Sequence, residues 1–548
     1  MSKVLPSSGA SPKVVSSVII SDVDDTSSDI VVQGLKKLGY QQELTRAVIQ
    51  HVSTVLLGLI VPLLDEGIFG YSLVFDSSAA ITAVPFGLGA PIATSLVGGG
   101  PAVILWGWVL ISVTTQPLAF SLAEVCSKYP TSAGAYYWCF RLTSPKYRLL
   151  ASWINGWLTM VGVWTICVSV AFGTAQILIA GVGIFQPEWV VTPAQTYAIF
   201  VGVTLFATLI GVFFSKLLPT IDIICAWWTV LGVIVMLVCL PVKAASGRHS
   251  AAFALGHFDP SFSGWAPGWS FFIGLLPPAF TYSAIGMVAS MAEEVHNPSV
   301  QLPLTLSWIV PISFIIGLIF LLPILFTLPD VETLLAVPGG QPLGVLFQLV
   351  MGSKGGGFGM WLIIFGIGVF CAISISCAAS RATWSFARDK AIPLHQVWSK
   401  VNKPLGDVPL NAYMLSLTIQ LLLGLIYLGS SAAFNAFIGV AVICLGASNT
   451  MPIAISLVNG RQDVADAPFS LGRWGYAVNI FAIVWMAFEI VLFSMPAVIP
   501  VTRVSMNYAS VVFVGFAAIS AIWYVVSGRY TYQGPPVPQE TEEKGSDV

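Results

Sequence analysis

Residues 269–298 read WSFFIGLLPPAFTYSAIGMVASMAEEVHNP, an apolar run that is long enough to cross a bilayer but has a fault in its middle. Pro277 and Pro278 remove two backbone donors, and Gly286 adds flexibility a few residues later. Lipid tolerates unpaired backbone groups only where protein or a water-filled cavity covers them. The pattern therefore predicts an interrupted membrane helix, which points to the substrate site of a transporter.

The composition of the whole chain agrees with a membrane protein. Of its 548 residues 56% are hydrophobic and only 9% are charged, and the mean hydropathy is +0.86. A soluble domain is about a quarter charged, so we expect an all-α polytopic membrane protein. The eight cysteines form no CxxC pair, and no nucleotide-binding motif is present. We expect no cofactor, no metal site, no enzymatic activity and no nucleic-acid partner.

Twelve apolar runs have the length of a transmembrane helix. They fall near 83–99, 101–124, 150–180, 196–215, 219–241, 269–291, 304–328, 357–380, 408–428, 431–458, 474–498 and 506–527. With the N-terminus inside, 19 of the 23 lysine and arginine residues fall in inside segments and 4 in outside segments. This asymmetry predicts that both tails, 1–50 and 529–548, are cytosolic and that the transporter domain covers 51–528.

The first span carries an interruption of its own, Pro85-Phe86-Gly87-Leu88-Gly89-Ala90-Pro91. Two interrupted helices five spans apart predict two inverted five-helix repeats, about 83–241 and 269–458, followed by two further helices in 474–527. The half-helix N-terminus after Ala90 would face an anionic group such as a carboxylate. Freed carbonyls and aromatic faces, with Phe280, Tyr282 and Ser283 in the second break, would suit an ammonium group.

Acidic residues near the helix ends are the remaining candidates. Glu293 and Glu294 follow the sixth span, and we expect them to close an inner gate or to pair with a basic loop residue, with proton coupling as an alternative. For Glu124 and Asp222 we expect solvation at the membrane interface. Glu489 lies in the middle of span eleven, where a charge is costly, so it should face the bundle or be protonated.

Three motifs resemble a known family: SLAEVCSKYPTSAGAYYW at 121–138, MVASMAEEVHNPSVQLP at 287–303 and CAASRATWSFARDKAIPLH at 377–395. They are similar to the amino acid–polyamine–organocation superfamily, and within it to the fungal GABA and choline permease branch. The resemblance implies a LeuT-like fold of two inverted five-helix repeats plus two helices. It also implies coupling to an inward proton gradient.

Site residues follow from the same resemblance. A carboxylate or other polar head group would be received by Gly87, Leu88, Gly89 and Ala90. The opposite side of the site would be lined by Phe280, Tyr282, Ser283 and Gly286. One departure is the block 61–83, which contains Asp65, Glu66 and Asp76 where a half-helix should lie. We hypothesise that this block is extra sequence, such as an intron retained in the gene model.

We therefore expect a secondary, proton-coupled transporter that imports a small amine-bearing solute such as an amino acid, GABA or choline. Zwitterions and quaternary amines both suit the predicted site, so the sequence leaves the substrate open. A transporter-like nutrient sensor and a metabolite exporter are the alternatives. The expected partners are the solute, protons and the lipid bilayer. We expect the plasma membrane as location, with the vacuolar membrane as the second choice.

Overall fold

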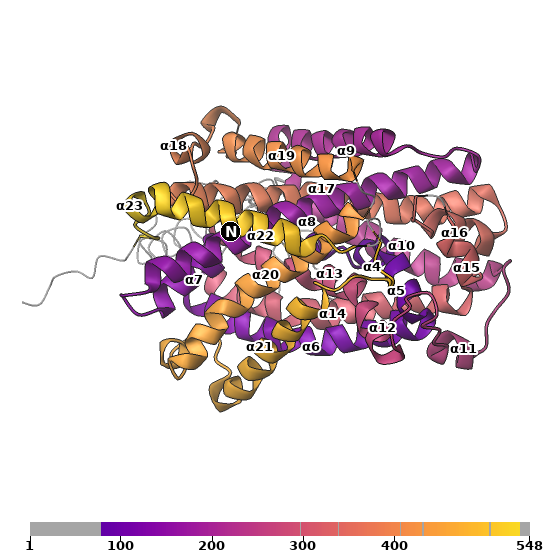
Figure 1. Ribbon diagram of the computed structural model, residues 1–548, viewed down its shortest axis with the longest axis horizontal. Helices are drawn as coiled ribbons and strands as arrows, with labels where there is room; N and C mark the ends of the chain where they lie inside the picture. Colours follow the sequence, from indigo (N-terminus) through magenta and orange to yellow (C-terminus); the bar gives the residue numbers. More distant parts are fainter. Residues whose placement is uncertain are drawn as a thin grey trace, which may run out of the picture.

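The computed structural model describes residues 78–536, apart from 296, 338, 406, 430–431 and 503–505. Helices make up the described chain, joined by short loops and 3-10 turns (Figure 1). The helices are α4 (Val84–Gly89), α5 (Ile92–Gly99), α6 (Pro101–Lys128), α7 (Ala135–Leu142), α8 (Arg148–Phe185), α9 (Pro193–Phe213), α10 (Leu218–Lys243), α11 (Ala251–Gly256), α12 (Pro267–Ile273), α13 (Leu276–Ser283), α14 (Pro298–Phe326), α15 (Val331–Leu335), α16 (Leu343–Met351), α17 (Lys354–Arg388), α18 (His395–Trp398), α19 (Leu410–Gly424), α20 (Ala433–Val458), α21 (Gly475–Leu492), α22 (Ala509–Trp523) and α23 (Arg529–Thr531).

Within the described residues, eleven helices are long and apolar enough to cross a membrane. A twelfth span results when the bent pair Ser78–Gly89 and Ile92–Gly99 is taken as one crossing. The prediction of twelve spans with an interruption in the first is therefore confirmed. The long helices run along one axis, and the loops gather at the two ends of the bundle (Figure 1). We call the end at which α6 ends in Lys128 and α17 ends in Arg388 the basic end.

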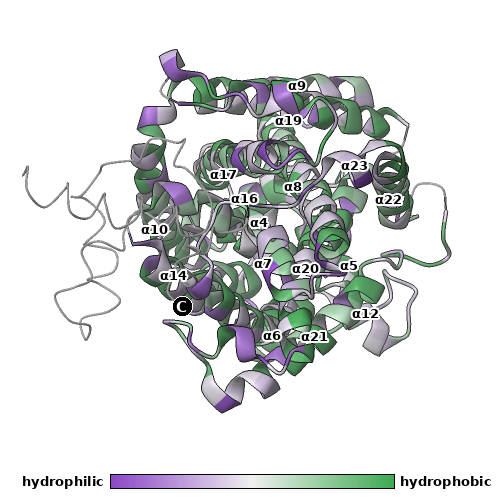
Figure 2. Ribbon diagram, turned by 90° about the vertical axis from the view of Figure 1, so that its left-hand side faces the viewer, coloured by the Kyte–Doolittle hydropathy of each residue, from purple (hydrophilic) through white to green (hydrophobic). Residues whose placement is uncertain are grey.

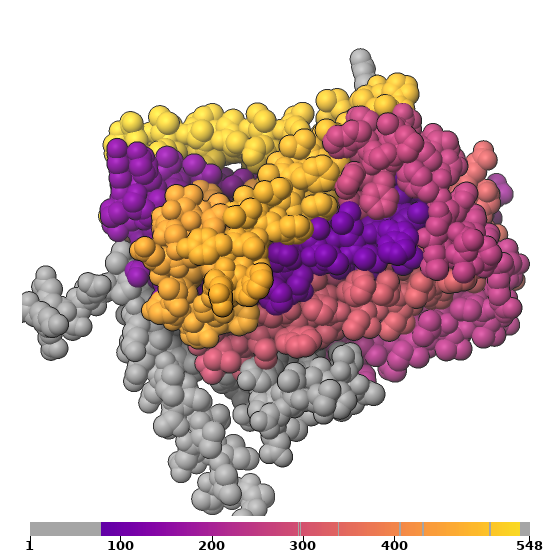
Figure 3. All heavy atoms as spheres, turned by 90° about the horizontal axis from the view of Figure 1, so that it is seen from below, coloured from indigo at the N-terminus to yellow at the C-terminus, as the bar shows by residue number. Residues whose placement is uncertain are grey.

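Equivalent helices of the two predicted repeats pack against each other. Helix α6 packs against α14, α8 against α17, and α9 against α19. Figure 2 shows α8 and α17 at the centre of the bundle, and α9 and α19 together along one side. Helix α6 also contacts α21, which belongs to the two helices after the repeats, and Figure 3 shows α6 between α21 and α14.

The first interruption lies where the sequence predicted it. Helix α4 ends at Gly89, Ala90 and Pro91 form a turn, and α5 starts at Ile92 after a bend of 45°. In a continuous helix the amide of Thr94 would bond to the carbonyl of Ala90, but here it donates to the carbonyl of Pro91 at 2.9 Å. The turn thus frees the Ala90 carbonyl for another partner.

The second interruption differs from the prediction in its position and its cause. The α-helix is interrupted at Gly274 and Leu275, before the two prolines, and α13 restarts at Leu276. Pro277 and Pro278 lie in the first turn of α13, where a missing amide donor costs nothing. After Ser283 the chain continues as a 3-10 segment, Ala284–Glu294. The prolines therefore lie at the start of a helix. The α-helix of this span is interrupted by the turn at Gly274 and Leu275, and after Ser283 it changes to a 3-10 helix.

The structure describes part of the predicted C-terminal tail and none of the predicted N-terminal tail. Residues 1–77 lie outside the described residues, and with them most of the acidic block 61–83. At the C-terminus, the side chain of Tyr532 is 4% exposed and its hydroxyl lies 2.7 Å from the Ser152 hydroxyl on α8. Its ring packs edge-on against Trp153, with 5.2 Å between the ring centroids. The described part of the predicted C-terminal tail, residues 529–536, thus contacts the basic end of the bundle.

Candidate functional site

The two half-helices away from the basic end, α5 and α12, which we call the outer half-helices, are joined by a reciprocal pair of hydrogen bonds. The Ser95 hydroxyl on α5 donates to the carbonyl of Gly274 at 2.7 Å, and the Ser270 hydroxyl on α12 donates to the carbonyl of Gly98 at 2.7 Å. Gly98 and Gly274 make the contact possible, because a Cβ on Gly98 would lie 2.6 Å from the Gly274 Cα. We call these four residues the glycine–serine clasp. It holds the outer halves of both interrupted spans as one unit.

The inner halves meet at Gly87 and Thr281. A Cβ on Gly87 would lie 2.6 Å from the Thr281 hydroxyl and 3.1 Å from its Cα, so α4 and α13 are in close backbone contact. Among the predicted site residues, Gly87, Leu88, Gly89 and Phe280 are buried around this contact. The two interruptions are thus neighbours in space, although about 190 residues separate them in the sequence.

Tyr282 packs against α6 and α14 and thereby supports the second interruption. Its ring stacks on Trp108 of α6, with 4.9 Å between centroids and 5° between planes. Its hydroxyl donates to the carbonyl of Val310 at 3.3 Å and lies 3.0 Å from the Ser112 hydroxyl. Ser283 is half-buried, and its hydroxyl donates to the carbonyl of Phe280 at 2.7 Å. The Tyr282 ring therefore uses one face for packing within the protein.

A cavity of about 480 Å³ opens beside the first interruption, on the side away from the basic end, where α5 and the start of α9 contribute to its lining. Volumes of this size are typical of small-molecule sites. Of the predicted site residues, Ala90 lines the cavity, together with Leu276 at the start of α13. The described polar and aromatic residues of its lining are neutral: Thr94, Gln176, Thr196, Asn435, Asn507, Tyr427, Phe434 and Phe493. They offer amide and hydroxyl groups for a polar head and aromatic rings for a cationic one.

A much smaller cavity, about 30 Å³, lies on the other side of the interruptions, towards the basic end. Its lining includes Gly286, Ser290 and Asn449. The Asn449 side chain of α20 fills the place that a side chain on Gly286 would occupy. The structure therefore has an open space on one side of the predicted site and close packing on the other, as in a transporter accessible from one side.

Polar contacts join several helix ends at the basic end, beyond this small cavity. Glu293, at the end of the 3-10 segment, accepts a hydrogen bond from Ser132 and forms an ion pair with Arg388 of α17 at 3.2 Å. At the same end of α17, the Tyr136 hydroxyl of α7 donates a hydrogen bond to the carboxylate of Asp389 at 2.8 Å. The predicted pairing of Glu293 with a basic residue is thus observed, while its role in gating stays a prediction, and the Glu294 side chain lies outside the described atoms.

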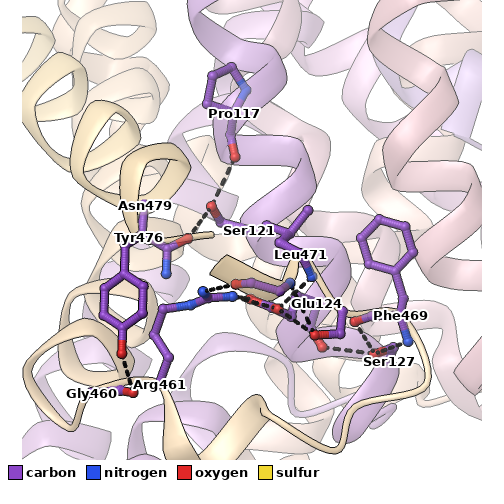
Figure 4. Close-up of polar contacts among 12 residues, drawn as sticks. Pro117, Ser121, Glu124, Ser127, Gly460, Arg461, Phe469, Leu471, Tyr476 and Asn479 are labelled. Atoms are coloured by element: carbon purple, nitrogen blue, oxygen red, sulfur yellow. Dashed lines mark hydrogen bonds and ion pairs between the residues drawn. The ribbon is translucent and has the colours of Figure 1, made fainter. Parts of the chain in front are cut away.

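Glu124 forms a second ion pair at the basic end, which corrects the expectation of a solvated carboxylate (Figure 4). Its side chain is buried, and Arg461 donates to both carboxylate oxygens at 2.6 and 2.7 Å. The backbone amide of Leu471 donates to the same carboxylate at 2.8 Å. The guanidinium group of Arg461 also lies 5.2 Å from the Tyr476 ring centroid. Burial of a charge requires such partners, and these connect α6 with the segment before α21.

The two other acids were predicted with different success. Asp222 is buried, and its carboxylate accepts a hydrogen bond from the Ser374 hydroxyl of α17 at 2.6 Å, so the expectation of interfacial solvation was wrong. Glu489 is 5% exposed and accepts a hydrogen bond from the indole of Trp485 at 2.7 Å. Its predicted orientation towards the bundle is confirmed.

Sequence reasoning missed several residues at these contacts: Ser95, Ser270, Thr281, Asn449 and Arg461. The serine pair had a weak signal, because each serine precedes a glycine by three or four residues in an interrupted span. Arg461 was counted as one of many inside cations, since nothing in its local sequence marks it as buried. The partners of these residues lie far away in the chain, so no local pattern identifies them.

Comparisons with known proteins agree with this geometry. Residues 73–517 match the amino acid permease family. The chain is 32% identical to the amino-acid permease BAT1 homolog of Oryza sativa subsp. japonica, over 91% of this chain and 94% of that protein. It is 32% identical to the polyamine transporter TPO5 of Saccharomyces cerevisiae, covering 87% and 80% of the two chains. It is 29% identical to a choline transporter of the same yeast, covering 81% and 78%.

The family match begins at residue 73, inside the acidic block 61–83. Residues 73–83 are therefore part of the matched sequence, and 78–83 belong to the first helical element of the structure. The hypothesis of extra sequence now applies only to 61–72, which lie outside the described residues.

Proposed function

This chain belongs to the amino acid permease family, and from that premise we propose that it imports a small amine-bearing solute, an amino acid or choline, by proton-coupled secondary transport. The observation that carries the proposal is the cavity of about 480 Å³ that ends at the Ala90–Pro91 turn. Backbone groups freed by such a turn are the usual ligands of substrates in transporters with interrupted helices.

The neutral lining of the cavity supports a solute of small net charge. The side-chain amides of Gln176 and Asn435 and the hydroxyl of Thr94 suit a carboxylate, and the rings of Tyr427 and Phe434 suit an ammonium group. A polyamine carries several charges, each of which needs a compensating group in a water-poor site. We propose that Tyr282, stacked on Trp108, holds the second interruption in place rather than forming a cage around the substrate.

Orientation and coupling complete the proposal. The excess of lysine and arginine at the basic end supports a cytosolic position for that end and for both tails. The cavity beside α5 then faces the outside, and the contacts of Glu293 with Ser132 and Arg388 close the cytosolic side. The plasma membrane is the proposed location. Coupling to protons follows from the superfamily resemblance, with Glu293 and Glu294 as candidates for gating or coupling.

Uptake in permease-deficient yeast tests this proposal. Cells that express the chain are given labelled amino acids, GABA, choline and a polyamine, each with and without a protonophore. We expect accumulation of at least one amino acid or of choline, and loss of most of that accumulation when the proton gradient is collapsed. A matched control uses the empty vector at the same expression conditions.

Three outcomes would contradict parts of the proposal. Accumulation that survives the protonophore would contradict proton coupling. Preferred uptake of the polyamine would contradict the argument from the neutral lining. No uptake of any solute by a chain that is present at the cell surface would contradict import and favour an exporter or a sensor.

A further inference from the structure

The Ala90 carbonyl, freed by the first interruption, has a partner from a distant loop. Gln341 lies between α15 and α16, and its side-chain amide donates to the Ala90 carbonyl at 2.8 Å. The backbone amide of Leu343 donates to the Gln341 side-chain oxygen at 3.2 Å. The Gln341 side chain is 3% exposed, so both ends of its amide are held in place inside the protein.

The loop is built to bring Gln341 to this position. Gly339 and Gly340 precede it with φ angles of 83° and 71°, which other residues adopt only with strain. Both glycines line the same cavity as Ala90. The α15–α16 loop, which we define as residues 339–342, therefore forms a wall of the cavity and at the same time contacts the turn where the cavity ends.

Helix α16 fixes the loop on two sides. The Leu343 side chain packs against Gly89, because a Cβ on that glycine would lie 3.0 Å from it. Gly344 packs against the Ala180 carbonyl of α8, with 2.5 Å from a built Cβ to the oxygen. The start of α16 is thus wedged between the first interruption and a central helix. A change in the bend between α4 and α5 must either move this loop or break the contact of Gln341 with Ala90.

We propose that Gln341 is a positioning residue for transport: it holds the Ala90–Pro91 turn in the geometry that binds substrate. The inference rests on the proposed function, because it assigns the turn to the substrate site. Gln341 acts through Ala90 and is not assigned a contact with substrate. Any transported solute should be affected alike, since the turn is common to all of them.

Two substitutions separate this role from general stability. Gln341→Leu removes both hydrogen bonds at nearly constant size. Gln341→Met also removes both hydrogen bonds and replaces the glutamine with an unbranched side chain of similar length. For the solute that wild type takes up, we expect both variants to raise KM by roughly three- to tenfold, the effect of losing one hydrogen bond. The maximal rate per molecule at the surface should change less than twofold by the same reasoning, since the protein remains folded.

Gln348→Leu is the matched control, because Gln348 is a half-buried glutamine on α16 that lies outside the cavity lining. It should leave KM at the wild-type value. If Gln341→Leu fails to reach the surface, Gln341→Met decides, since its unbranched side chain follows the path of the glutamine. A wild-type KM for Gln341→Met, or an equal rise for Gln348→Leu, would overturn the inference. A wild type without any uptake would overturn the proposed function, and the inference with it.

Discussion

Replacing Gly98 by alanine is expected to reduce uptake by roughly tenfold or more, which is the effect of overpacking by 1–3 kcal/mol at a site that must close. The new Cβ would lie 2.6 Å from the Gly274 Cα and 3.0 Å from the Gly274 amide and from the Ser270 carbonyl. All three are backbone atoms, so no side chain can move to relieve the clash. The outer half-helices α5 and α12 must separate, and the hydrogen bonds of the glycine–serine clasp lengthen.

Gly268→Ala is the matched control for this experiment. Gly268 lies on α12 one turn before the clasp, and a Cβ there would meet nothing within 4 Å. It should transport like wild type, whereas Gly98→Ala should be present at the surface with little uptake. The measurement is initial uptake rate per molecule at the cell surface. Normal uptake by Gly98→Ala would show that close contact between the two outer half-helices is not needed for transport.

Replacing Arg461 by leucine is expected to give the largest loss of stability among single substitutions at the basic end. Removing one partner of a buried ion pair leaves the other charge uncompensated and costs about 3–5 kcal/mol. Here the remaining group is Glu124, which is 1% exposed and would keep only the neutral donors of Leu471 and Ser470. We expect the apparent melting temperature of the purified protein to fall by several degrees, together with its amount at the surface.

A double variant distinguishes charge pairing from simple loss of packing. Glu124→Gln combined with Arg461→Leu removes both charges, keeps an acceptor for the Leu471 amide, and should recover part of the lost stability. Arg473→Leu, on an exposed arginine of the same segment, serves as the control and should melt like wild type. A double variant as unstable as Arg461→Leu would contradict the pairing argument.

The fold was predictable because its signals are local. Apolar runs of about twenty residues, the lysine and arginine asymmetry and the glycine and proline positions each lie within one segment of the sequence. That the two interruptions lie close together in space was predictable from their matching positions in the two repeats. The exact fault in the sixth span did not follow, because Pro277 and Pro278 were taken to break a helix that they in fact begin.

The polar contacts of the site were beyond sequence reasoning. Glu124 and Arg461 are 337 residues apart, and Gln341 and Ala90 are 251 residues apart. Which of several acids and amides meets which partner depends on helix rotation and packing, and local hydropathy contains neither. The same holds for Tyr282. An aromatic ring at this position suggested one wall of a site for an ammonium group, but in the folded chain the ring stacks on Trp108.

The central claim is that substrate enters the cavity beside α5 and binds at the first interruption. Ala93 is half-buried and lines that cavity one turn from the interruption, so a cysteine there should react with a membrane-impermeant thiol reagent in intact cells. Glu188→Cys, in the exposed loop between α8 and α9, provides the control. We expect a transported solute at saturating concentration to slow labelling of Ala93→Cys and to leave Glu188→Cys unchanged. Equal labelling of Ala93→Cys with and without that solute would contradict the claim.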